Sequence, residues 1–79
     1  MKFKIEVMPK TDVLDPQGVA VEKALSKMNF SGLTRVRIGK SIEVEVTGTD
    51  AAKAEQDVKS MAQKLLCNAN VETFKVTAL

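Results

Sequence analysis

Few residues in this sequence combine a reactive type with a neighbour that would activate it. Cys67 is the only cysteine and the chain contains no histidine, so a thiol nucleophile would lack its usual base. A zinc site is equally disfavoured, because carboxylates alone would have to complete it. The remaining acid–base candidates are Asp12, Asp15 and Asp50, and the last two precede expected helices, where helix capping accounts for them. The sequence therefore predicts no catalytic residue, no metal site and no cofactor bound by this chain.

One short segment is similar to a phosphate-binding loop but does not complete it. Gly39-Lys40-Ser41 matches the end of a P-loop, yet the first glycine of that motif would fall on Thr34, and no helix is expected after the serine. Two interpretations remain for Arg37 and Lys40. They belong either to a bulged strand with solvent-facing cations or to a contact with a protein or a phosphate group.

Size and composition indicate an ordinary small globular protein that needs a second subunit. The 79 residues suit a single domain, 1–79, with 44% hydrophobic and 28% charged residues. A net charge of +2 without basic clusters argues against nucleic acid, and no apolar run is long enough for a membrane span. The N-terminus lacks a signal-peptide core and the lone thiol suits a reducing compartment, which predicts a cytoplasmic protein. Because so short a chain buries a small core and has no disulfide, we expect oligomerisation to supply the additional stability.

Hydrophobic periodicity predicts two strands and two helices outside the centre of the chain. Phe3, Ile5 and Val7 alternate with charged residues as in a half-buried strand that Pro9 ends. A helix is predicted from Asp15-Pro16, and Asn29 to Gly32 stops it. A second helix is predicted from Asp50 to Asn68, which can end it in a left-handed conformation, and a last strand over Val71 to Ala78. The inward residues expected on the first helix are Val21, Ala24, Leu25 and Met28, and on the second Ala54, Val58, Met61, Ala62 and Leu65.

Residues 34–47 permit two structures. Apolar residues occupy even positions on both sides of Gly39, so the segment predicts either a hairpin around that glycine or one long strand bent there. A two-residue turn would mix core and solvent faces, and a three-residue turn would place Ser41 where a left-handed residue is usual. One strand would reach about 45 Å at roughly 3.3 Å per residue, beyond a compact domain of this size. A strand of that length requires a second chain to complete it, and this is the preferred interpretation.

The element order predicts an α+β fold. Strand, helix, long strand or hairpin, helix and strand give an antiparallel sheet with both helices on one face, close to the split βαβ arrangement. Phe3, Phe30 and Phe74 fit the core, so no exposed aromatics remain to stack on RNA bases. Nothing in this pattern identifies an active site.

Three segments of the sequence carry recognisable motifs. They are Val13-Leu14-Asp15-Pro16-Gln17-Gly18, then Val36-Arg37-Ile38-Gly39-Lys40-Ser41-Ile42-Glu43-Val44-Glu45-Val46, then Lys64-Leu65-Leu66-Cys67-Asn68-Ala69-Asn70-Val71-Glu72. Together they resemble the PurS family, and the resemblance runs essentially from end to end. Chain length, motif order and spacing agree with the family. One departure is that Ala69-Asn70 stands where the family has Asn-Pro-Val.

The resemblance implies the small, non-catalytic subunit of phosphoribosylformylglycinamidine synthase, a glutamine-dependent carbon–nitrogen ligase of purine biosynthesis. Such a subunit bridges a large synthetase subunit of the PurL type and a glutaminase subunit of the PurQ type; the complex uses ATP, Mg and glutamine. The resemblance also implies a ferredoxin-like-related fold and a dimer or tetramer with exchanged segments. The residues it marks as architectural or contact positions are Asp15, Gln17, Gly18, Arg37, Gly39 and Lys40.

Two other functions fit the predicted fold. One is a small-ligand-binding regulatory domain of ferredoxin-like type, in which an effector lies between paired sheets. Tight binding of amino acids or nucleotides by the isolated chain would favour it. The other is a small acylphosphatase-like hydrolase, which the lack of a phosphate loop disfavours.

Overall fold

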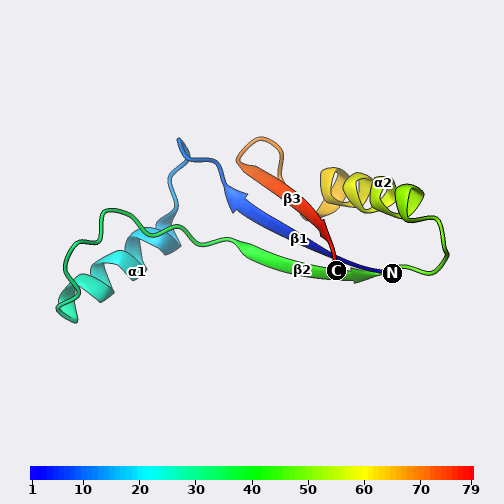
Figure 1. Cartoon of the computed structure of the whole chain (residues 1–79). Helices are drawn as coiled ribbons and strands as arrows, with labels where there is room; N and C mark the ends of the chain where they lie inside the picture. The colour runs from blue at the N-terminus through cyan, green and yellow to red at the C-terminus, as the bar shows by residue number, and fades with distance from the viewer.

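Three strands form one antiparallel sheet in the order β2-β1-β3, with β1 in the centre (Figure 1). The computed structural model describes all 79 residues. Along the chain the elements are β1 (Lys2–Pro9), α1 (Pro16–Lys27), β2 (Lys40–Glu45), α2 (Ala51–Met61), a π-helical turn η1 (Ala62–Leu66) and β3 (Glu72–Ala78). The α+β class and the two terminal strands are as predicted. None of the helices has the length and apolar character that crossing a bilayer requires.

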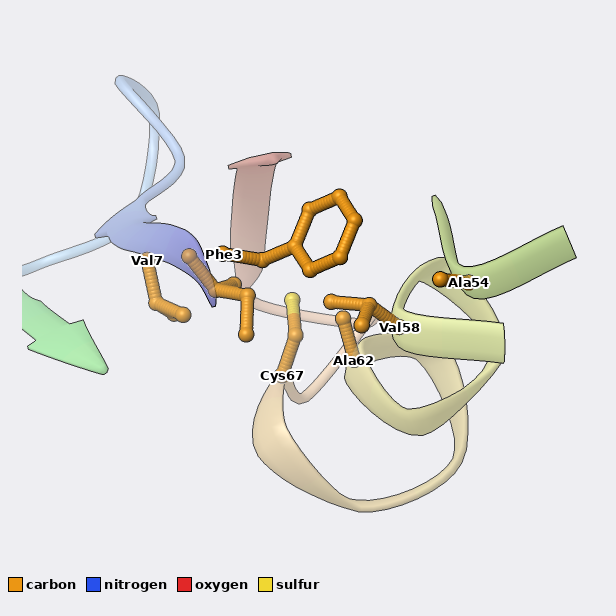
Figure 2. Packing of buried hydrophobic residues seen from close by; sticks show 7 residues of the cluster. Phe3, Val7, Ala54, Val58, Ala62 and Cys67 are labelled. Carbon is orange, nitrogen blue, oxygen red and sulfur yellow. The ribbon is translucent and has the colours of Figure 1, made fainter. Parts of the chain in front are cut away.

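The core lies between the central strand and helix α2. Phe3, Ile5 and Val7 of β1 are buried, and Figure 2 shows Phe3 near Val58, with Ala62 and Cys67 beside it. Asp50 caps α2 as predicted, because its Oδ1 accepts from the Lys53 backbone N–H at 3.1 Å. Flanking residues complete the cluster without being fully buried; they are Ile42, Val44, Val46, Leu66, Phe74 and Val76.

A π-helical turn at the end of α2 changes which side chains face inward. The Cys67 N–H donates to the Ala62 carbonyl at 2.9 Å, an i to i−5 bond that widens this turn. Leu66 and Cys67 therefore turn toward the core, and Leu65 is 84% exposed, so the predicted inward position of Leu65 is wrong.

The predicted left-handed end at Asn68 is wrong as well. In this chain the only non-glycine residue with positive φ is Asn29, after α1. Asn68 instead organises the turn into β3: its Oδ1 accepts from the Asn70 N–H at 3.2 Å and its backbone N–H donates to Glu72 at 2.8 Å.

Helix α1 does not lie on the sheet, contrary to the prediction that both helices cover one face. Figure 1 shows α1 beyond the end of β1, while α2 packs beside the sheet and both termini lie at the opposite end. The molecule measures 50 × 24 × 15 Å with a radius of gyration of 16.0 Å, against roughly 12 Å for a compact chain of this length. We call α1 and the segment 28–39 that follows it the arm. Its apolar side chains, Phe30 among them, are not in the core of this chain because no sheet lies beneath them.

Residues 34–47 form neither a hairpin nor one long strand. β2 pairs with β1, with Lys40 opposite Val7 and Glu45 opposite Lys2. Residues 36–38 therefore do not pair with β2, as a hairpin would require. Figure 1 shows the chain turning back after α1 and then running into β2 without a further reversal, in agreement with one extended passage. The strand is shorter than predicted because β1 ends at Pro9, and the residues before Lys40 lie past that end without a strand to pair with.

Candidate functional site

The carboxylate of Asp15 ties the start of α1 to the chain segment that leads into β2. Its Oδ1 accepts from the Gly18 N–H at 3.0 Å, which is the predicted helix cap. Its Oδ2 accepts from the Ile38 N–H at 2.8 Å, a bond across 23 residues that the sequence did not reveal. The Ile38 bond, followed by the Gly18 bond, lowers the pKa of Asp15 from its ordinary value, because both donors favour the charged form.

Two glycines permit close approaches of backbone at this junction. A Cβ on Gly18 would collide with the carbonyl oxygen of Val36, and Gly18 is the only buried residue of α1. A Cβ on Gly39 would collide with the carbonyl oxygen of Val7 and with Met8. Gly39 does not have positive φ, so contact with β1, and not an unusual backbone conformation, explains this glycine.

Two arginines of the arm hold the loop after β1. Arg35 Nη2 donates to the Thr11 carbonyl at 2.8 Å, and Arg37 Nη2 donates to the Pro9 carbonyl. Arg37 is half-buried, which corrects the expectation of a solvent-facing side chain. Its Nε is buried and has no hydrogen-bond partner. Asp15, Gly18, Arg37 and Gly39 thus form one junction at the base of the arm.

The other two predicted site residues contribute less to this junction. Lys40 is exposed at the first position of β2, as expected for a solvent-facing cation. The side chain of Gln17 is exposed, and only its backbone N–H lies near the Asp15 carboxylate.

A depression of about 660 Å³, here called the strand-end pocket, opens beside Arg37. Its lining residues are Met8, Lys10, Thr11, Asp12, Arg37 and Thr73. Only Asp12 and Arg37 had been singled out from the sequence. Lys10 and Thr73 have no sequence signal, because β1–β3 pairing, which sets Met8 opposite Thr73, brings them together.

The junction offers hydrogen-bond donors and positive charge, and no arrangement for proton transfer. No three residues among the aspartates, glutamates and Cys67 gather closely enough to hold a metal ion. Cys67 lies at the edge of the core, far along the chain from the junction; burial, and then the charge of Glu72, raises the pKa of its thiol. This chemistry suits recognition of another molecule.

Comparison with known proteins identifies the family of this chain. Residues 2–79 match the family model PurS, described as phosphoribosylformylglycinamidine (FGAM) synthase. The chain belongs to the PurS family. A PurS subunit of phosphoribosylformylglycinamidine synthase from Synechocystis is 40% identical to it, over 96% of this chain and 78% of the relative. One from Bacillus subtilis is also 40% identical, over 94% of this chain and 87% of the relative.

The fold of this PurS-family chain also matches solved structures. A chain in the structure of PurLQS from Thermotoga maritima has a TM-score of 0.89 and 36% identity. That match covers 99% of this chain and 95% of the other. The arm is therefore included in the likeness, because so complete a coverage extends over both the sheet and α1.

Proposed function

We propose that this chain is the small subunit of phosphoribosylformylglycinamidine synthase and acts there as a non-catalytic adaptor. The observation that carries the proposal is the match over nearly the whole chain to a component of a PurLQS structure, together with relatives named as PurS subunits of that synthase. As part of this complex the chain belongs to a carbon–nitrogen ligase that takes its nitrogen from glutamine. The chain by itself has no activity in this proposal.

The shape of the chain suits an adaptor. Its core is small, with 8 of 79 residues buried, and much of its apolar surface is left for other chains. On and around the arm, Leu14 is 77% exposed, Met28 64% and Phe30 57%. We infer that a second copy covers these side chains, so that the working unit is a dimer or a dimer of dimers. An assembly of that kind presents the same docking surface more than once.

The proposed partners are a large synthetase subunit and a glutaminase subunit, as in PurLQS. ATP, Mg and glutamine are used by those subunits and not bound by this chain. Holding the glutaminase against the synthetase limits the loss of ammonia to solvent, because the source is kept close to its point of use. The complex would operate in the cytoplasm.

The six marked residues divide between architecture and contact in this proposal. Asp15, Gly18 and Gly39 set the angle of the arm through backbone contacts at the junction. Lys40 is exposed and free of ion pairs, which suits a contact with another subunit. Arg37 serves both purposes, and Gln17 is exposed on the first turn of α1.

Reconstitution of the complex tests the adaptor role. Glutamine-dependent amidine formation by the three components is compared with ammonia-dependent turnover by the large subunit alone. Omitting this chain is expected to depress the first reaction and leave the second unchanged. Lys40→Ala is expected to weaken assembly, with Lys75→Ala on exposed β3 surface as the matched control. The proposal is wrong if glutamine-dependent turnover and complex formation are the same with and without this chain.

A further inference from the structure

The strand-end pocket lies on the sheet face opposite α2. Successive residues of a strand point to opposite faces, so Met8 faces away from the side on which Val7 is buried. Thr73 stands opposite Met8 in the register of β1 and β3, and it shares that face. The pocket is therefore separate from the core and remains open where the sheet carries no helix.

Arg37 enters this pocket with most of its hydrogen-bonding capacity unused. A guanidinium carries five N–H donors, and the Pro9 carbonyl takes one of them. Its Nε is buried without a partner, which is costly for a charged donor. The Pro9 bond holds the guanidinium against the loop after β1 and leaves its remaining donors for an incoming acceptor.

The charges around the pocket favour an anion. Lys10 and Arg37 line it and neither forms an ion pair within the chain, while Asp12 supplies one opposing charge. The lining therefore has a net charge of +1, which attracts a negatively charged group. The planar guanidinium fork also matches the two oxygens of a carboxylate.

The form of the pocket indicates that the carboxylate belongs to a macromolecule. The lining residues include a single apolar one, Met8, and the depression opens broadly to solvent. Small-molecule sites are usually concave and mostly apolar, so a free metabolite would gain little burial here. An acidic side chain held by a folded partner needs no such enclosure, because the surrounding interface excludes water.

We propose that the strand-end pocket receives the carboxylate of an aspartate or glutamate side chain of a partner subunit, bound by Arg37 and Lys10. The inference rests on the proposed adaptor function and assigns it a docking point. Binding there also joins the partner to the junction that holds the arm, since Arg37 contacts the loop after β1. The partner's position and the angle of the arm are thereby coupled.

Four variants test the pocket in the reconstituted complex: Arg37→Lys, Arg37→Gln, Lys10→Gln and the control Lys75→Gln. Arg37→Gln is expected to weaken binding to the partner subunits about 30-fold or more, and Lys10→Gln about tenfold. Arg37→Lys keeps the charge but loses the fork, and we expect it to resemble Arg37→Gln. Lys75→Gln should bind as the wild type does. The side chain of Lys10 makes no hydrogen bond within the chain, so Lys10→Gln reports on binding even if Arg37 variants unfold.

A second measurement follows the Arg37 Nε–H signal by NMR in the wild-type chain. Adding the partner subunits should shift that signal, and inorganic phosphate should not. Normal assembly by Lys10→Gln and Arg37→Lys would overturn the inference, as would a shift on adding phosphate alone. Weakened self-association in place of weakened partner binding would also overturn it, since the carboxylate would then come from a second copy. If the wild-type chain binds no partner subunit at all, the proposed function itself fails.

Discussion

Replacing Phe30 with serine tests whether the arm is the surface through which two copies of this chain associate. Phe30 is 57% exposed in the single chain and follows the left-handed residue that ends α1. Serine removes its apolar ring and keeps a residue suited to a loop. Folding of the sheet should be unaffected, because Phe30 is not part of the core cluster.

The expected loss of dimer stability follows from the exposed fraction of the Phe30 side chain. Complete burial of a phenylalanine side chain is worth about 1.5–3 kcal/mol, so burying the exposed 57% gives roughly half of that, about 1–1.5 kcal/mol. A symmetric dimer contains two copies of the contact, which doubles the effect to about 2–3 kcal/mol. The dimer dissociation constant should therefore rise about 30-fold or more.

Sedimentation equilibrium over a range of concentrations measures this constant directly. The wild-type chain is expected to be a dimer or larger at micromolar concentration, against 8.6 kDa for the monomer. Leu65→Ser is the matched control, since Leu65 is 84% exposed but lies on η1, outside the arm. A folded wild-type monomer would refute the reasoning. So would a Phe30→Ser variant that dimerises like the wild type, or a Leu65→Ser variant whose dimer is weakened as much.

Three further predictions concern the junction and the core. Gly39→Val should destabilise the chain by about 1–3 kcal/mol or more in urea, because its side chain would collide with the Val7 carbonyl, whereas Ser41→Val on exposed strand surface should not. Asp15 has a folded pKa below its ordinary 3.8, so its carboxylate stabilises the fold above that value and the contribution is lost as pH falls through the folded pKa. Asp15→Asn should therefore flatten the acid limb of a stability–pH curve, and an unchanged limb would contradict this. Cys67→Ala should preserve turnover of the complex, and iodoacetamide should label Cys67 only after unfolding; rapid labelling of the native chain would show that the thiol is not buried.

Local signals in the sequence were sufficient for most of the elements. Alternation in the first strand, caps at Asp15 and Asp50, and the stop at Asn29 each act over a few residues, and the structure confirms them. The errors at Leu65 and Asn68 arise where α2 ends. Asn68 lies beyond the helix, because Leu66 ends η1 and Cys67 is already extended. The error at Leu65 has another cause. A π-helical turn shifts the helical period by one residue, and the hydrophobic pattern alone gives no warning of it.

The candidate site was predicted in part. Asp15 was recognised as a cap, and its neighbours Gly18, Arg37 and Gly39 were marked through the family resemblance. The structure gives these residues roles other than the expected bend and solvent-facing cation. Gly39 allows close contact with β1, and Arg37 is held against the Pro9 carbonyl. Lys10 and Thr73 were missed because they join Arg37 only when separate segments meet at the end of β1.

Residue types and local order were enough to predict the family and the α+β class. The position of α1 depends on packing between distant segments, which the sequence does not show. Helical periodicity shows that α1 has an apolar side, but not whether the partner for that side belongs to the same chain. Because β1 ends at Pro9 and Asp15 binds Ile38, the helix is held beyond the sheet, and its apolar residues remain exposed to a second molecule.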